Sequence, residues 1–150
     1  MIGLVQRVAE ARVSVASRVV GAIGRGALLF VCAEPADTVE IADRLVAKVL
    51  ALRIFADAHG KMNLDLGAIG GGLLVVSQFT LAADTSRGNR PGFSGAADPA
   101  HARLLYERVV ATARGVHAGE VACGEFGADM QVALVNDGPV TISLDSKARE

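Results

Sequence analysis

The sequence predicts one domain of the α+β class. Strand-like segments outnumber helical ones, only two segments have a clear helical pattern, and a regular alternation of strand and helix is missing. A length of 150 residues suits one domain, and 51% hydrophobic with 21% charged residues is typical of a packed globule. We expect residues 1–144 to form this domain and the charged residues 145–150 to be a frayed tail.

The first third of the chain has the pattern of strands. Residues 2–8 alternate imperfectly between apolar and polar side chains, and Val13 and Val15 continue the extended pattern. The apolar run 27–33 predicts a buried strand. Three glycines mark turns before it: Gly21, Gly24 and Gly26.

The first helix is predicted to begin after Asp37, which can cap it, with Glu40 three residues later as in a capping box. It should end near Arg53. Its apolar residues recur at helical spacing: Val39, Ala42, Leu45, Val46 and Val49. Residues 57–63 then predict a turn.

The middle of the chain predicts one strand and the second helix. The strand over 73–81 follows three glycines and is apolar at first but polar toward its end. A loop rich in Gly, Arg and Ser covers 82–94. The helix is predicted over about 98–114, with Pro99 in its first turn.

Composition excludes several classes of protein. A net charge of -1 excludes a protein that grips nucleic acid by bulk charge, although not one that touches RNA at a single end. No Trp, one Tyr and five Phe argue against a base-stacking platform. The longest apolar run is too short for a bilayer and the N-terminus lacks a signal-peptide pattern, so we expect a cytoplasmic protein without a membrane partner.

The usual catalytic groups are nearly absent. Ser77 lies in VVSQF rather than in GxSxG. No Cys or His has a partner at metal-ligand spacing, so we expect neither a metal nor a cofactor. The cysteines Cys32 and Cys123 are interpreted as buried thiols. The histidines are interpreted as surface residues: His59, His101 and His117.

Two segments remain unusual. Residues 77–81 turn polar at the end of a strand, either because the strand emerges into water or because its N–H groups and hydroxyls hold an oxyanion. Residues 136–139 (Asn-Asp-Gly-Pro) split two final strands, 130–135 and 140–144. They are either a hairpin turn or a cis Gly-Pro bond that presents carbonyls to a ligand, and composition alone favours the turn.

The two segments together resemble the signatures of the D-aminoacyl-tRNA deacylase family, also called D-tyrosyl-tRNA deacylases. The signatures are SQFTLAAD at 77–84 and LVNDGPVT at 134–141. Either motif alone is weak, but the resemblance continues in order through nearly the whole chain. The further blocks are MIGLVQRV at 1–8, LRIFAD and GKMNL within 52–64, RGNRPGFS at 87–94 and FGADMQV at 126–132.

This resemblance implies a fold, an assembly and a substrate. The fold would be a mostly antiparallel, barrel-like sheet with two main helices packed to one side. The protein would be a homodimer with its active site at the interface. The substrate would be the acceptor end of tRNA carrying a D-amino acid on its terminal adenosine, with no DNA partner and no cofactor.

The implied chemistry explains the missing nucleophile. An aminoacyl ester is already activated, and one well-placed donor is commonly worth 10²–10³ in rate. By resemblance the N–H of Phe79 is this donor, and the residues that shape the pocket are Ser77, Gln78 and Thr80. The neighbouring ribose hydroxyl can help to activate water. Thr80 could instead be a nucleophile, but no base for it is evident, so we interpret it as a positioning residue.

Chirality would be read by Gly138 and Pro139. In the family the bond between them is cis and enters the other subunit's pocket, where its carbonyls crowd the side to which an L side chain points. Glycine has no side chain to reject, so glycyl-tRNA should also be cleaved. By resemblance Arg7 supports this element and Met130 lines the pocket. Two loop arginines are candidate contacts to tRNA phosphates: Arg87 and Arg90.

Two other functions fit the residues. One is a small esterase that uses Ser77 or Thr80 covalently. The other is a non-catalytic dimeric module that only binds tRNA ends. Turnover would separate catalysis from binding, and a trapped acyl-enzyme would identify the covalent route.

Overall fold

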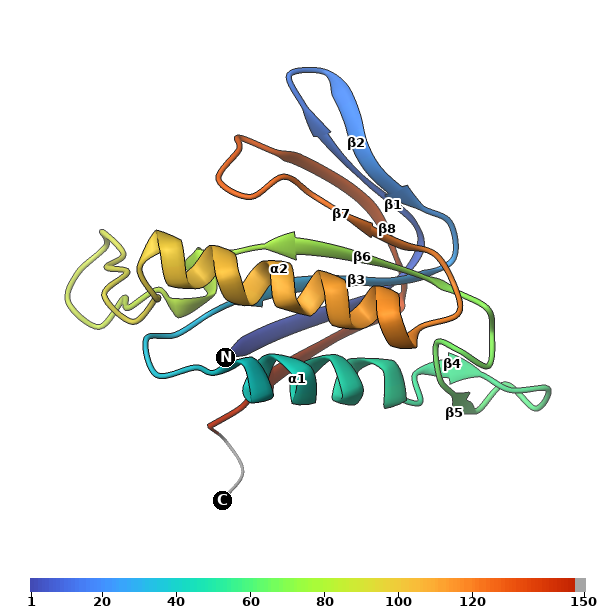
Figure 1. Ribbon diagram of the computed structural model, residues 1–150. Coiled ribbons are helices and arrows are strands. Elements are labelled where there is room, and N and C mark those ends of the chain that lie inside the picture. The colour runs from blue at the N-terminus through green and yellow to red at the C-terminus, as the bar shows by residue number, and fades with distance from the viewer. Residues whose placement is uncertain (148–150) are drawn as a thin grey trace.

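The computed structural model describes residues 1–147 and contains a six-stranded sheet with two helices on one side (Figure 1). The strands of the large sheet are β1 (Ile2–Val15), β2 (Arg18–Ile23), β3 (Gly26–Cys32), β6 (Gly72–Ser77), β7 (Val121–Cys123) and β8 (Gln131–Asp145). A small hairpin is formed by β4 (Phe55–Ala56) and β5 (Met62–Leu64). The helices are α1 (Val39–Ala51), the short 3-10 helix η1 (Phe79–Ala82) and α2 (Pro99–Val116).

The large sheet is mostly antiparallel, as the resemblance implied, but it includes two parallel pairings. The long strand β1 pairs antiparallel with β2, β3 and β8, whereas β3 and β7 both pair parallel with β6. Parallel pairing arises because α1 lies between β3 and β6 and α2 lies between β6 and β7, and a helical crossover returns the chain to the same edge. Contacts between β2 and β7 nearly close the sheet into a barrel.

The central strands are buried on both faces. Leu29 and Val75 belong to the core cluster that packs against the helices. Leu28, Leu74 and Val76 belong to a second cluster on the opposite face, inside the curved sheet. This double burial explains why β3 and the start of β6 are continuous apolar runs instead of alternating ones.

Both helices begin close to their predicted positions. α2 begins at Pro99 as predicted, and Asp98 caps it, because its carboxylate accepts hydrogen bonds from two N–H groups of the first turn at 3.1 Å. The prediction for α1 was wrong by one residue, since Thr38 is the cap and accepts from the N–H of Ile41 at 3.3 Å. Asp37 is instead buried, where it accepts from the amino group of Met1 at 2.7 Å.

The C-terminal residues 145–147 are attached to the domain. Asp145 is the last residue of β8, the N–H of Ser146 donates to the carbonyl of Met1 at 3.0 Å, and Lys147 pairs with Glu34 at 2.8 Å. The frayed tail predicted for 145–150 thus differs from the structure over these three residues, and residues 148–150 lie outside the described part of the chain.

Residues 136–139 are part of a strand, not a hairpin turn. β8 is continuous through them and pairs with β1 on either side, with register shifts of β1 between Gln6 and Glu10. The peptide bond between Gly138 and Pro139 is cis, as the resemblance implied. The residue types that favour turns also suit an irregularity in a strand ladder, which explains why local composition pointed to the wrong element.

Some smaller predictions also need correction. β6 ends at Ser77 and the chain turns into η1, so the strand is shorter than predicted. Cys32 is buried as expected, but Cys123 is only half-buried. His101 and His117 are half-buried, and each ring bonds a backbone carbonyl instead of lying free on the surface.

Among residues 1–147, none of the helices combines the length and apolarity needed to span a bilayer.

Candidate active site

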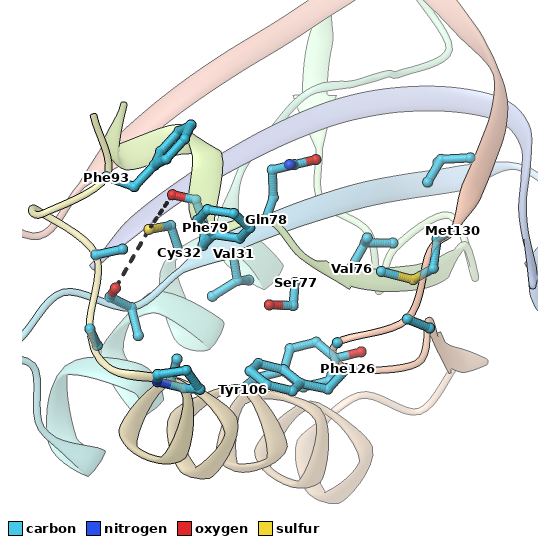
Figure 2. Close-up of a pocket in the computed structure, with 18 residues that line it drawn as sticks. Val31, Cys32, Val76, Ser77, Gln78, Phe79, Phe93, Tyr106, Phe126 and Met130 are labelled. Carbon is cyan, nitrogen blue, oxygen red and sulfur yellow. Dashed lines mark hydrogen bonds between the residues drawn. The ribbon is translucent and has the colours of Figure 1, made fainter. Parts of the chain in front are cut away.

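A cavity of about 580 Å³ lies where β3 and β6 end, between η1 and the N-terminal half of α2 (Figure 2). Its walls are largely apolar, and Ser77 and Gln78 contribute the polar groups at the strand end. Met130, just before β8, and Phe79 also line it. The structure therefore brings together four of the residues that the sequence singled out, and a mostly apolar pocket with few polar groups is typical of a ligand site.

The N–H of Phe79, a residue that lines the cavity, has no hydrogen-bond partner among residues 1–147. The N–H of Gln78 still donates to the carbonyl of Val31 at 2.8 Å, which completes the β3–β6 ladder. The chain then leaves the strand, and Phe79 becomes the first residue of η1. N–H groups at the start of a helical turn have no partner within it, and none of residues 1–147 supplies an acceptor for that of Phe79. Such a group can bind an oxygen that carries negative charge.

Thr80 lies next to the cavity but outside its wall. The Nε2 of Gln78 donates to its hydroxyl oxygen at 2.5 Å. Among the described residues, neither a histidine nor a carboxylate bonds this hydroxyl. Nothing in this arrangement would remove its proton, so the contact favours a positioning role for Thr80 over a nucleophilic one.

The thiol of Cys32 contacts the backbone of η1. Its Sγ lies 3.5 Å from the carbonyl oxygens of Phe79 and Ala33, as the dashed lines in Figure 2 mark. Burial raises the pKa of the Cys32 thiol. The group therefore stays protonated at neutral pH and acts as a weak donor to η1 rather than as a nucleophile.

Aromatic rings form the opposite wall and the mouth. Tyr106 of α2 donates its hydroxyl to the carbonyl of Val75 at 3.1 Å, and burial raises the pKa of this hydroxyl. Its ring lies tilted against Phe126, with centroids 5.8 Å apart. At the mouth, Phe79 and Phe93 meet edge to face at 5.1 Å.

Sequence reasoning missed most of this wall, including the residues whose contacts are described above: Cys32, Phe93, Tyr106 and Phe126. Phe93 and Phe126 lie inside two of the blocks that resemble the family, 87–94 and 126–132, and these blocks are the signal that could have identified them. Tyr106 follows the apolar spacing of α2, a pattern that equally predicts an ordinary core residue.

Gly138, Pro139 and Arg7 form a separate cluster. Arg7 donates to the carbonyl of Ile54 at 2.7 Å and to that of Asp137 at 2.9 Å, so it ties the Gly-Pro segment to the start of β4. Gly138 and Pro139 are exposed, and neither lines the pocket of its own chain. Figure 1 shows β4 near the C-terminal end of α2, whereas the pocket lies at the N-terminal half of that helix.

Arg87 and Arg90 are exposed on the loop between η1 and α2. Two hydrogen bonds close this loop, from the N–H of Asp84 to the carbonyl of Gly92 at 2.8 Å and from the N–H of Gly92 to the carbonyl of Asp84 at 2.9 Å. Phe93 follows directly, so the same loop carries both arginines and one ring of the pocket mouth.

A family model described as D-Tyr-tRNA(Tyr) deacylase matches residues 4–145. The chain belongs to this family. A D-aminoacyl-tRNA deacylase of Methylibium petroleiphilum is 64% identical to this deacylase over 144 residues, which cover 96% of the chain and 94% of the relative. One from Aromatoleum aromaticum is 63% identical over the same shares. The family resemblance is thus confirmed, and with it the activity: the deacylase is an ester hydrolase that acts on D-aminoacyl-tRNA.

A solved structure gives the same fold for this deacylase. The c-Myc DNA unwinding element binding protein superposes with a TM-score of 0.93 at 37% identity, over 99% of this chain and 100% of the other. The barrel-like sheet with its helices on one side is therefore shared with this solved structure. The described residues contain no group of three or more His, Cys, Asp or Glu side chains placed to hold a metal.

Proposed function

We propose that this deacylase hydrolyses D-aminoacyl-tRNA by binding the ester carbonyl against the N–H of Phe79. The observation that carries the proposal is this N–H group, which faces no acceptor of the described chain at the edge of an apolar cavity. Negative charge develops on the carbonyl oxygen during attack by water, and a fixed donor there stabilises it. The substrate's ribose hydroxyl helps to activate the water.

The other strand-end residues shape the site in this proposal. Ser77 and Gln78 supply the polar part of the wall and Met130 part of the apolar one. Thr80 accepts the bond from Gln78 and fixes its side chain. A covalent route through Ser77 or Thr80 is less favoured, because nothing near the Thr80 hydroxyl takes its proton and Ser77 is not bonded to a histidine in the described chain.

The active site is completed by a second copy of the chain. Gly138 and Pro139 are exposed, are held from behind by Arg7, and do not reach the pocket of their own chain. A homodimer with two-fold symmetry would place each Gly-Pro segment in the other pocket. Val135 of β8 and Val19 of β2 are 51% and 53% exposed, so the sheet offers apolar side chains for such a contact.

The Gly-Pro segment reads chirality by exclusion. Its carbonyls would crowd the face of the α-carbon to which an L side chain points, whereas a D side chain points away. Glycine has no side chain to exclude, so glycyl-tRNA is a second substrate. Gly138 has φ of 131°, a conformation that L residues rarely adopt, and a Cβ there would lie 2.7 Å from Nη2 of Arg7.

The tRNA is held locally at its acceptor end. With a net charge of -1 the chain has no bulk attraction for a nucleic acid, so Arg87 and Arg90 beside the pocket mouth are the phosphate contacts that we propose. The same charge argues against DNA as a partner. Because aminoacyl-tRNA is used in translation, the proposal places the enzyme in the cytoplasm.

Deacylation time courses on matched D-Tyr-tRNA, L-Tyr-tRNA and glycyl-tRNA test the proposal. We expect rapid loss of the D ester and of the glycyl ester, with the L ester intact. Loss of D and L esters alike would leave a hydrolase but contradict exclusion by the Gly-Pro segment. Loss of none would leave a module that only binds tRNA ends.

A further inference from the structure

We propose that Phe79 and Phe93 form a stacking site for the unpaired nucleotides that precede the esterified adenosine, with Arg87 and Arg90 holding their phosphates. This inference rests on the proposed function, because it extends the same site beyond the ester. The ligand is single-stranded RNA, recognised by base faces and phosphodiester charge and not by base sequence.

The two rings are unusually exposed. Phe79 is 54% and Phe93 37% exposed, in a chain with only five phenylalanines. Their planes meet at 74° with centroids 5.1 Å apart, an edge-to-face contact that leaves ring faces uncovered. Figure 2 shows both rings on the same side of the cavity, so a chain whose last residue enters the pocket passes them.

The loop that carries Phe93 is pre-ordered. The Asp84–Gly92 bridge closes it at one end. At the other end, the N–H of Ala96 donates to the carbonyl of Phe93 at 3.0 Å and the N–H of Ala97 donates to the carbonyl of Ala33 at 2.9 Å. A ring on a fixed loop loses little entropy when a base stacks on it.

The guanidinium groups on this loop are available. Arg87 and Arg90 are exposed, and within residues 1–147 neither pairs with a carboxylate. Aromatic rings beside cations are the combination by which proteins hold single strands without reading sequence. The low aromatic content predicted no stacking platform, but the fold gathers two of the five Phe rings at one place.

A graded set of substrates tests the stacking site. D-Tyr-adenosine lacks the preceding nucleotides, the D-Tyr ester of a CCA trinucleotide contains two of them, and D-Tyr-tRNA contains the whole acceptor end. For Phe93→Ala we expect a loss of kcat/KM, mainly in KM, that is roughly 5- to 150-fold greater on the other two substrates than on D-Tyr-adenosine. Phe93→Trp, which keeps an aromatic ring, should keep kcat/KM close to the wild-type value on these two substrates. Leu104→Ala, which truncates a 53% exposed side chain of α2, is the matched control.

The phosphate contacts have their own readout. Replacing Arg87 or Arg90 by Gln should reduce the slope of log KM against log salt for D-Tyr-tRNA by about 0.7 each, the value for one contact to a single strand. The same variants should leave the salt dependence of D-Tyr-adenosine hydrolysis unaltered, because this substrate carries no phosphate. An unaltered slope in both variants would overturn the phosphate contacts.

Two results would overturn the stacking site. If Phe93→Ala slows all three esters equally, Phe93 only supports the Phe79 ring. If the variant dissociates the dimer, the rings are covered by the second copy. Binding of an unesterified CCA trinucleotide separates this inference from the proposed function. If the trinucleotide binds only when Phe93 is present and the protein cleaves no ester, the proposed function is refuted and the stacking site is supported.

Discussion

Replacement of Phe79 by proline removes the proposed catalytic donor with little change elsewhere. Proline has no N–H, and its fixed φ suits the first position of a helical turn, which Phe79 occupies in η1. No hydrogen bond of the fold is lost, because none of residues 1–147 accepts from this N–H, and the adjacent bond from Gln78 to Val31 remains. Phe79→Ala removes the same ring but keeps the N–H, so it is the matched reference.

The expected effect is the value of one oxyanion donor. The Phe79→Pro variant should be about 10²–10³ slower than Phe79→Ala, or about 2.7–4 kcal/mol of transition-state stabilisation. Single-turnover deacylation of D-Tyr-tRNA at saturating enzyme measures this rate without a contribution from binding. Circular dichroism and the thermal midpoint check that the variant is folded. A proline variant within about threefold of the alanine variant would refute the oxyanion role.

Three further predictions follow from other contacts. Gly138→Ala should slow D-Tyr-tRNA cleavage about 5- to 150-fold, because strain at a positive φ costs about 1–3 kcal/mol and the new Cβ meets a guanidinium. Gly60→Ala, with φ of 76° and open space around its Cβ, should leave the rate unchanged, and equal rates for the two variants would contradict the argument. Thr80→Ala should keep D-Tyr-tRNA cleavage within about tenfold of the wild type, with no acyl-enzyme on acid quenching; an abolished rate would indicate a nucleophile. Hydrogen bonds from Arg108 lower the pKa of Asp43 from 3.8 to about 2, so its stabilisation is present above pH 3.8 and lost as the pH falls through about 2. Asp43→Asn should therefore lower the urea midpoint near neutral pH and converge on the wild type in acid, and a pH-independent difference would argue against this ion pair.

The sequence predicted those parts of the fold that depend on local pattern. The apolar run of β3 and the start of β6 are buried as expected, and α2 begins with Pro99 in its first turn. The two family motifs located Ser77 and Gln78 at the pocket. These features were predictable because strand burial, the start of a helix and a contiguous motif are all set by residues that are close together in the chain.

Long-range contacts decided the remainder. Asp37 and Thr38 are both good capping residues, and the choice between them was settled by the buried contact of Asp37 with the amino group of Met1. The Asn-Asp-Gly-Pro segment became part of a strand because β1 pairs with it on either side. Phe93 and Tyr106 joined the pocket from two segments that only the fold brings together.

A mixed-dimer experiment tests the central claim that each site takes its pocket from one copy and its Gly-Pro segment from the other. Phe79→Pro chains and Gly138→Ala chains are each slower than the wild type on their own, the latter about 5- to 150-fold, and are combined by co-refolding. Random mixing gives dimers in which one site has an intact Phe79 and receives an intact Gly138 from its partner chain. The account predicts recovery of about a quarter of wild-type D-Tyr-tRNA cleavage. If the mixture is no more active than the mean of the two variants measured separately, the shared site is contradicted.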